Sequence, residues 1–204
     1  IRPVYADDTE LCLQSNMKDS LFSMLKTDQD ARHLELKAID EGATRDSEEL
    51  LMLMKKTAVI DQKNLIELEG LLSTCGWPKK DVVGIRVSEA AAVLSLHAGK
   101  KFWDKYLSMM EAALKQGDLA PDFYGMLIDK MLIEQGKLQR YGTQIDMFTN
   151  KMLPIEDETH LNDRRQEIGL TLLGSHPLPQ TFILTIPDLP AKPTQSMKSK
   201  KTVK

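Results

Sequence analysis

Hydrophobic residues recur every three to four positions along most of the chain, a spacing typical of amphipathic helices. Leucine, methionine and aromatic residues make the stripes, and glycines or prolines separate them. A short segment differs, because residues 138–155 alternate only partly, which favours a strand or an extended loop. We therefore predict a mostly α, single-domain bundle of about five to six helices, with helices at 17–40, 48–74, 89–98, 101–116, 121–135 and 158–168.

Polar residues interrupt two of these stripes. Asp28 and Arg32 lie four residues apart on or beside the apolar face of the first helix. They form either a surface ion pair or a partly buried pair that lines a cleft, and the spacing alone favours the surface pair. Asp61 and Asn64 interrupt the second stripe in the same way.

The two ends of the chain differ in composition from the helical region, which we place at residues 7–175. Val4-Tyr5-Ala6 has the small-x-small form of a signal-peptidase site, so residues 1–6 are read as a signal-peptide remnant. Residues 176–204 are proline-rich and then basic, a composition that predicts a disordered tail. The expected location is thus periplasmic or secreted, with the cytoplasm as the alternative.

Two cysteines, Cys12 and Cys75, carry further information about the compartment. In an exported protein they could form a disulfide that ties the N-terminal segment to Gly76-Trp77-Pro78. Two unpaired thiols are the alternative, and it is favoured here because nothing in the sequence fixes the distance between them. No histidine neighbours either cysteine, so the sequence predicts no zinc site, no other metal and no cofactor.

Charge and motif content narrow the function classes. The chain has 27 basic and 30 acidic side chains, and this balance argues against nucleic-acid binding. No apolar run approaches the length of about 20 residues that a transmembrane helix needs. The chain also lacks a phosphate-binding Walker loop, a dinucleotide-binding glycine pattern, a zinc-protease helix and a Gly-x-Ser-x-Gly elbow.

Several residues remain as candidates for chemistry. His97 follows three alanines on a predicted helix and could act as a general acid or base, although packing would also explain it. Trp77 is either a structural plug or one wall of a pocket, and the plug is favoured. The polar segment Arg140-Tyr141-Gly142-Thr143-Gln144 could bind a ligand or satisfy helix ends. Arg164 and Arg165 could bind an anion, but a solvated helix face is the usual meaning of paired arginines.

The order of short motifs along the chain carries a resemblance to a known family. The chain is similar to a bacterial family of unknown function that has Gly-Trp-Pro, Gln-His-Ala and Tyr-Gly-Thr-Gln blocks in that order. Leu96 departs from this pattern, because the family usually has glutamine before the histidine. The similarity covers residues 20–173, and the matching positions are Asp28-Gln29, Arg32, Asn64, Gly76-Trp77-Pro78, Val83-Gly84, Ala90-Ala91, His97-Ala98, Asp129, Gly136, Gln139, Tyr141-Gly142-Thr143-Gln144, Pro154-Ile155, Asp157, Arg164-Arg165 and Gly169-Leu170.

Three functional hypotheses follow from these candidates. The first is an exported binding or interaction module, whose polar cleft lies between the helices and residues 138–148 and takes a small polar ligand or a protein partner. The second is a metal-independent hydrolase or transferase, in which His97 is the acid/base, Asp129 or Asp28 orients it, and Gln144 with Arg164 holds the substrate. The third is a secreted effector with a basic tail. The expected ligand-binding residues are Asp28, Arg32, Asn64, Trp77, Arg140, Tyr141, Gln144 and Arg164.

Overall fold

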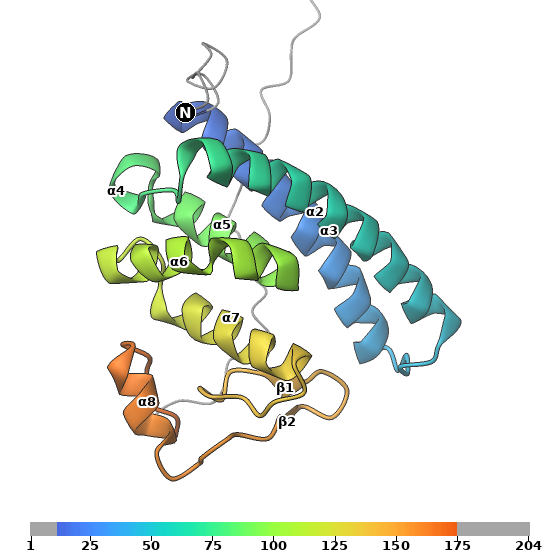
Figure 1. The fold of residues 1–204 in the computed structure, drawn as a ribbon. Helices are drawn as coiled ribbons and strands as arrows, with labels where there is room; N and C mark the ends of the chain where they lie inside the picture. The colour runs from blue at the N-terminus through green and yellow to red at the C-terminus, as the bar shows by residue number, and fades with distance from the viewer. Residues whose placement is uncertain (1–11, 175–204) are drawn as a thin grey trace, which may run out of the picture.

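A long antiparallel helix pair forms one side of the molecule (Figure 1). The computed structural model describes residues 12–174, and in it α2 spans Gln14–Asp40 and α3 spans Glu48–Cys75. The buried residues of α2 follow the helical repeat, and Asp28 and Glu35 lie within that buried stripe beside Leu21 and Leu25. The polar residues that interrupt the hydrophobic pattern therefore face inward.

Four further helices follow, in the order α4 (Lys80–Val83), α5 (Ile85–His97), α6 (Lys100–Gln116) and α7 (Pro121–Glu134). Helices α4 and α5 pack against the pair, and α7 packs on α5 and α6. Helix α5 is central, since it contacts α2, α3 and α7. Ala90, Ala91 and Ala92 are all buried, and their small side chains let the neighbouring helices approach α5 closely. The last residue of α5 is His97, which therefore lies where three helices meet.

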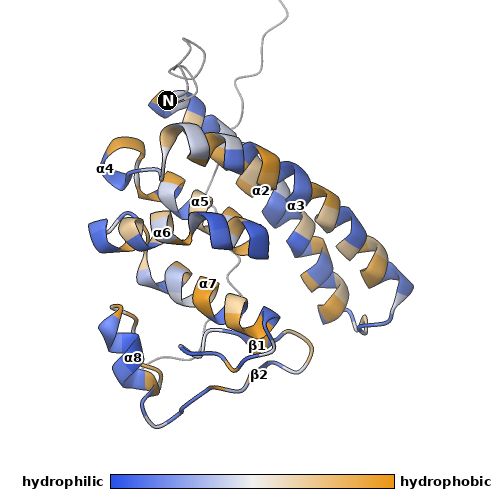
Figure 2. Ribbon diagram, viewed as in Figure 1, coloured by the Kyte–Doolittle hydropathy of each residue, from blue (hydrophilic) through white to orange (hydrophobic). Residues whose placement is uncertain are grey.

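Residues 135–174 lie along the side of α7 that faces away from α5 and α6 (Figure 1). Strands β1 (Ile145–Asp146) and β2 (Lys151–Met152) pair antiparallel, with Ile145 opposite Met152, and helix α8 (Leu161–Glu167) follows them. Figure 2 shows that apolar and polar residues alternate around most helices, in keeping with a core between amphipathic elements.

The predicted fold class is confirmed, while several boundaries differ. Helix α5 begins at Ile85 rather than after Ser88, and the short α4 before it was not predicted. Ser88 lies within α5, where its hydroxyl donates to the backbone oxygen of Asp118 and accepts a hydrogen bond from Trp77 Nε1 at 3.3 Å. Gly84, with φ of 89°, separates the two helices, a backbone conformation that favours glycine. Within 138–155, only four residues are in strands.

The preference for unpaired cysteines is wrong. Cys12 and Cys75 form a disulfide, with their Cα atoms 5.5 Å apart. The cysteines are 63 residues apart in sequence, and only the antiparallel pairing of α2 with α3 brings the start of one helix to the end of the other. The disulfide thus fastens the beginning of α2 to the turn that contains Trp77.

Two expectations concern the ends of the chain. Residues 1–6 and 176–204, expected to be a signal-peptide remnant and a disordered tail, lie outside the described residues. Within residues 12–174, no helix combines the length and the apolar character that crossing a membrane requires.

Candidate active site

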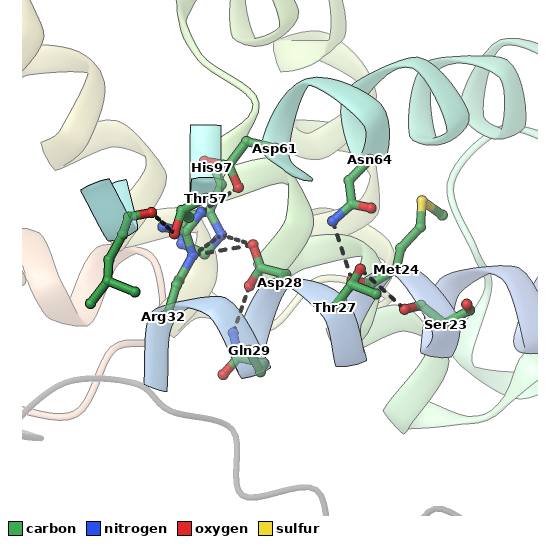
Figure 3. A network of polar contacts seen from close by, with 11 residues as sticks. Ser23, Met24, Thr27, Asp28, Gln29, Arg32, Thr57, Asp61, Asn64 and His97 are labelled. Carbon is green, nitrogen blue, oxygen red and sulfur yellow. Dashed lines mark hydrogen bonds and ion pairs between the residues drawn. The ribbon is translucent and has the colours of Figure 1, made fainter. Parts of the chain in front are cut away.

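Four charged or titratable side chains from α2, α3 and α5 meet at the C-terminal end of α5 (Figure 3). His97 Nδ1 lies 2.8 Å from Asp28 Oδ1. Arg32 Nε lies 3.1 Å from the same carboxylate oxygen, and Arg32 Nη2 donates to Asp61 Oδ1 at 2.6 Å. Gln29 Nε2 donates to the second oxygen of Asp28 at 2.7 Å. The carboxylate of Asp28 thus has partners on both oxygens.

The contacts determine which nitrogen of His97 carries the hydrogen. Arg32 Nε also lies 3.1 Å from His97 Nδ1. An arginine nitrogen can only donate, and this N–H already has the Asp28 carboxylate as its acceptor. If Nδ1 were unprotonated, its lone pair would face the lone pairs of the Asp28 carboxylate at 2.8 Å, which is repulsive. A hydrogen on Nδ1 removes this repulsion, so Nδ1 donates to Asp28 and Nε2 keeps its lone pair.

The pKa values of both partners support the same protonation state. Burial lowers the pKa of His97 below 6.5; the hydrogen bond and charge of Asp28 oppose this, while the charges of Arg32 and Lys130 add to it. Burial would raise the pKa of Asp28, but the hydrogen bond from His97 and the nearby positive charges outweigh it and lower that pKa. Near pH 7 the pair is therefore a neutral imidazole held by an ionised carboxylate.

A cavity of about 600 Å³ opens beside this pair, within the range of small-molecule sites. Helices α2, α5 and α7 form one part of its wall, and Thr143, Gln144 and the β1–β2 region form the other. Arg45, from the loop between α2 and α3, pairs with Asp146 and lies over the Phe148 ring at 4.1 Å, which joins the two parts. The lining residues are Gln29, Arg32, Glu35, Leu36, Arg45, Val93, Leu96, His97, Met126, Lys130, Thr143, Gln144, Ile145, Asp146, Met147 and Leu153.

Three side chains that line the cavity have polar atoms without a hydrogen-bond partner in the described part of the chain. Among residues 12–174, no side chain or backbone group hydrogen-bonds to His97 Nε2, to the Glu35 carboxylate or to Lys130 Nζ. In the same range, no fully buried side-chain nitrogen or oxygen atom lacks a partner. These three groups must therefore reach the space of the cavity itself. His97 has 18% of its side chain exposed, enough for one edge of the ring.

The cluster also contains a set of atoms with metal-ligand chemistry. One atom each from Asp28, Asp61 and His97 lies within 4.8 Å of the others. However, the Arg32 guanidinium donates to both carboxylates, so it already supplies the positive charge between them. The arrangement therefore fits an arginine-centred ion cluster better than a metal site.

Asp129 lies in a different network from His97. Its Oδ1 accepts hydrogen bonds from the backbone nitrogens of Arg140 and Tyr141 at 2.6 and 2.8 Å. Its Oδ2 accepts from the backbone nitrogen and the hydroxyl of Thr143 at 2.9 and 2.8 Å. Of the two carboxylates considered as orienting groups for His97, the structure brings only Asp28 to it.

The paired arginines hold the same loop from its other side. Arg164 donates to the backbone oxygens of Arg140 and Asp157 at 2.9 and 2.7 Å. Arg165 donates to the backbone oxygens of Tyr141 and Thr171 at 2.5 and 2.7 Å. Gly142, at φ of 65°, makes the turn between these contacts. The polar motif at 140–144 thus serves mainly to fix a loop, and its last residues, Thr143 and Gln144, reach the cavity.

The remaining expected ligand-binding residues lie away from the cavity. Asn64 is buried and donates to the backbone oxygen of Met24 at 3.2 Å, which joins α3 to α2 (Figure 3). Trp77 is buried in the core with its indole nitrogen near Ser88. Arg140, Tyr141 and Arg164 do not line the cavity. Of the expected set, Asp28, Arg32, His97 and Gln144 are therefore brought together around it.

Sequence reasoning did not single out Glu35, Asp61 or Lys130 as site residues. The sequence does contain a sign of Lys130, because this residue lies one turn after Met126 and therefore on an inward-facing stripe of α7. Glu35 likewise follows Asp28 by two turns on the buried stripe of α2. Charged residues at core positions of two helices were thus the available sign of a polar cavity.

The chain matches a family of unknown function (DUF6624) over residues 15–178. No curated protein and no solved structure matches the chain significantly.

Proposed function

The chain belongs to the DUF6624 family of unknown function, and we propose that its cavity is an active site in which His97 acts as a general acid/base on a small polar substrate. The single observation that carries this proposal is the His97–Asp28 pair at the cavity wall, with Nδ1 of the imidazole 2.8 Å from the carboxylate. An oriented neutral imidazole with a free lone pair is the form that accepts a proton.

Hydrolysis is the reaction class that the surrounding residues favour. Among the described residues that line the cavity, Thr143 alone has a hydroxyl group and none has a thiol, and the Thr143 hydroxyl already donates to Asp129. A covalent serine- or cysteine-type mechanism therefore lacks its nucleophile. Water can serve instead: Nε2 of His97 takes one proton, the oxygen attacks an electrophilic carbon, and the same proton then goes to the leaving group.

Asp28 has a defined part in this mechanism. Its carboxylate accepts from Nδ1, which fixes the ring and stabilises the imidazolium that forms after proton transfer. Arg32 and Gln29 hold the carboxylate in place through further hydrogen bonds. Asp28 and Arg32 are thus positioning residues, whereas His97 is the group that meets the substrate.

The substitution His97→Asn tests the proposal. In His97→Asn the amide can replace the Nδ1 hydrogen bond to Asp28, but the free lone pair of Nε2 is lost. Hydrolysis of p-nitrophenyl acetate and p-nitrophenyl hemisuccinate should exceed background with the unaltered protein. The variant should lose about 100-fold or more of this rate. Equal rates for the variant and the unaltered protein across the panel would contradict an acid/base role.

A binding module without turnover is the second candidate function. The observation in its favour is that the polar wall is already organised, since Gln144 Nε2 donates to the backbone oxygen of Met126 at 3.3 Å and to Thr143 Oγ1 at 3.1 Å. A wall held in this way loses little conformational entropy when a ligand binds. A ligand that binds unaltered protein and His97→Asn equally and is recovered unchanged would favour this candidate.

We further propose that the protein works in an oxidising compartment, either the periplasm or the extracellular space. The support is the Cys12–Cys75 disulfide, because such bonds persist outside the reducing cytoplasm. Alkylation of the protein from its native cells with a thiol reagent, before and after reduction, tests this. Two thiols blocked only after reduction are expected, and two thiols reactive without reduction would place the protein in the cytoplasm.

A further inference from the structure

The charges that line the cavity indicate which class of ligand it takes. Three cations and two anions lie in its wall, in addition to His97. Arg32 pairs with Asp28 and Asp61, and Arg45 pairs with Asp146. Of the charged residues in the wall, one cation and one anion take no part in these ion pairs: Lys130 from α7 and Glu35 from α2.

Lys130 presents an ammonium group without a direct partner in residues 12–174. Burial is the main influence that lowers its pKa, followed by the charge of Arg32, and Glu134, Asp61 and Asp28 oppose the shift. Asp28 and Asp61 are already committed to Arg32, and Glu134 is exposed on the next turn of α7. The ammonium is therefore partly desolvated and uncompensated, the state in which an added oxyanion binds most favourably.

Glu35 presents the opposite charge. Its side chain is buried, with 8% of the residue exposed, and yet no donor among the described residues reaches its carboxylate. No ion pair joins Glu35 to Lys130, so the two charges occupy separate positions on the cavity wall. A carboxylate without a donor in the protein depends on water or on a ligand in the cavity for its hydrogen bonds, so a ligand cation can pair with it directly.

We propose that the cavity binds a small zwitterion of the amino-acid or short-peptide class, whose carboxylate pairs with Lys130 and whose ammonium group pairs with Glu35. The inference rests on the proposed function for its reaction but not for its binding, because neither charge belongs to the His97–Asp28 pair. A ligand held at both ends would span the cavity past His97, since all three groups line the same space. Its central ester or amide group is then the position that His97 can reach.

Three matched probes separate the two charges. Glycylglycine carries both, N-acetylglycine carries only the carboxylate, and glycinamide carries only the ammonium group. Titration of the full chain by calorimetry or by NMR should show glycylglycine binding about tenfold or more tightly than either single-charge probe, because each lost charge removes one charge-assisted hydrogen bond. The backbone amides of Thr143 and Gln144 should shift on binding, which places the probe in the cavity.

Substitutions then assign each end. Lys130→Met should weaken glycylglycine and N-acetylglycine by about tenfold or more and leave glycinamide unchanged. Glu35→Gln should weaken glycylglycine and glycinamide and leave N-acetylglycine unchanged. Lys137→Gln is the matched control, since Lys137 is exposed just beyond α7 and should change nothing. Both cavity variants should unfold at the same temperature as the unaltered protein or above it, because each removes a buried charge without a partner.

The outcomes are distinct from those of the hydrolysis test. Saturable binding of glycylglycine that His97→Asn preserves would support the zwitterion site even if hydrolysis failed. The proposal is overturned if none of the three probes binds saturably, if N-acetylglycine or glycinamide binds as tightly as glycylglycine, or if Lys130→Met and Glu35→Gln leave binding unchanged. A large drop in the unfolding temperature of either variant would also overturn it, because that result would assign the charge to the structure.

Discussion

Two buried polar networks of this molecule, one around Asp129 and one around Asp28, differ in how their hydrogen bonds are satisfied. Around Asp129, every partner is a backbone group or a hydroxyl of the 140–143 loop, and both carboxylate oxygens are filled. Around Asp28, the partners are side chains from α2 and α5, and the histidine among them keeps a free nitrogen toward a cavity. A complete network stabilises a structure, whereas one with free atoms is suited to a ligand.

The difference indicates which residues shape the site and which act in it. Asp129 and Arg164 hold the loop that carries Gln144 to the cavity, so they affect the site indirectly. His97 lines the cavity from α5, and Asp28 on α2 contacts its ring from behind. Substitutions in the first network should therefore lower stability, and those in the second should lower activity.

The largest effect on stability is expected from Asp129→Ala. This change leaves three backbone N–H groups and the Thr143 hydroxyl without their acceptor. We expect the free energy of unfolding in urea to fall by about 3 to 5 kcal/mol. Asp129→Asn, which keeps one acceptor oxygen, should lose less. A loss below about 1 kcal/mol for the alanine variant would remove the structural role given to Asp129.

Loss of the disulfide should have the next largest effect. Cys75→Ser opens a link between positions 63 residues apart, and the free energy of unfolding should fall by about 2 to 4 kcal/mol. The free energy of unfolding of the unaltered protein in urea should fall by the same amount when a reductant is added. The double variant Cys12→Ser/Cys75→Ser should not respond to reductant, and a response of that variant would show that the reductant acts elsewhere.

Substitution of His97 should change stability least and activity most. His97→Asn should alter the free energy of unfolding by less than about 1 kcal/mol, because the Asp28 hydrogen bond can be kept. His97→Gln places its amide where Nε2 stood and loses the bond to Asp28, so it should be the less stable of the two. Both should lack hydrolysis. If His97→Asn proves as destabilising as Asp129→Ala, the two networks have the same role and the comparison fails.

The pH dependence provides a smaller effect with a defined sign. Burial holds the pKa of His97 in the folded protein below 6.5, its ordinary value. The folded state therefore binds fewer protons than the unfolded state, and the stability that this gives is present above pH 6.5 and is lost as the pH falls through the folded pKa. Urea unfolding between about pH 8 and pH 5 should show this loss for the unaltered protein. The same loss should be reduced in His97→Asn, and an equal loss in both would assign it to other groups.

The fold could be predicted from the sequence more fully than the site. Helical periodicity and glycine breaks place the helices, because these signals are local. The unpaired-thiol preference failed since the approach of Cys12 to Cys75 depends on how two long helices pair. The Asp28–Arg32 pair, for which the surface was favoured, is beside a cavity because α5 packs against that face of α2 and α7 packs on α5. Residue spacing within one helix carries no information about such neighbours.

The polar motif at 140–144 shows the same limit. Its hydrogen-bonding groups were identified from the sequence, but a ligand and a helix end are equally good partners for them. Only the position of Asp129 and Arg164 around the loop decides in favour of an internal network. Lys130 and Glu35 were detectable in principle, because both are charged residues on inward-facing stripes.

The proposed role of His97 depends on its protonation state at neutral pH, which ¹⁵N NMR of the imidazole ring measures directly. We predict a neutral ring near pH 7 with hydrogen on Nδ1 and a lone pair on Nε2, and a pKa below 6.5. Asp28→Asn should lower that pKa further, because Asp28 raises it in the unaltered protein. A ring that is doubly protonated at pH 7, or that carries its hydrogen on Nε2, would contradict the assignment of His97 as the acid/base of this site.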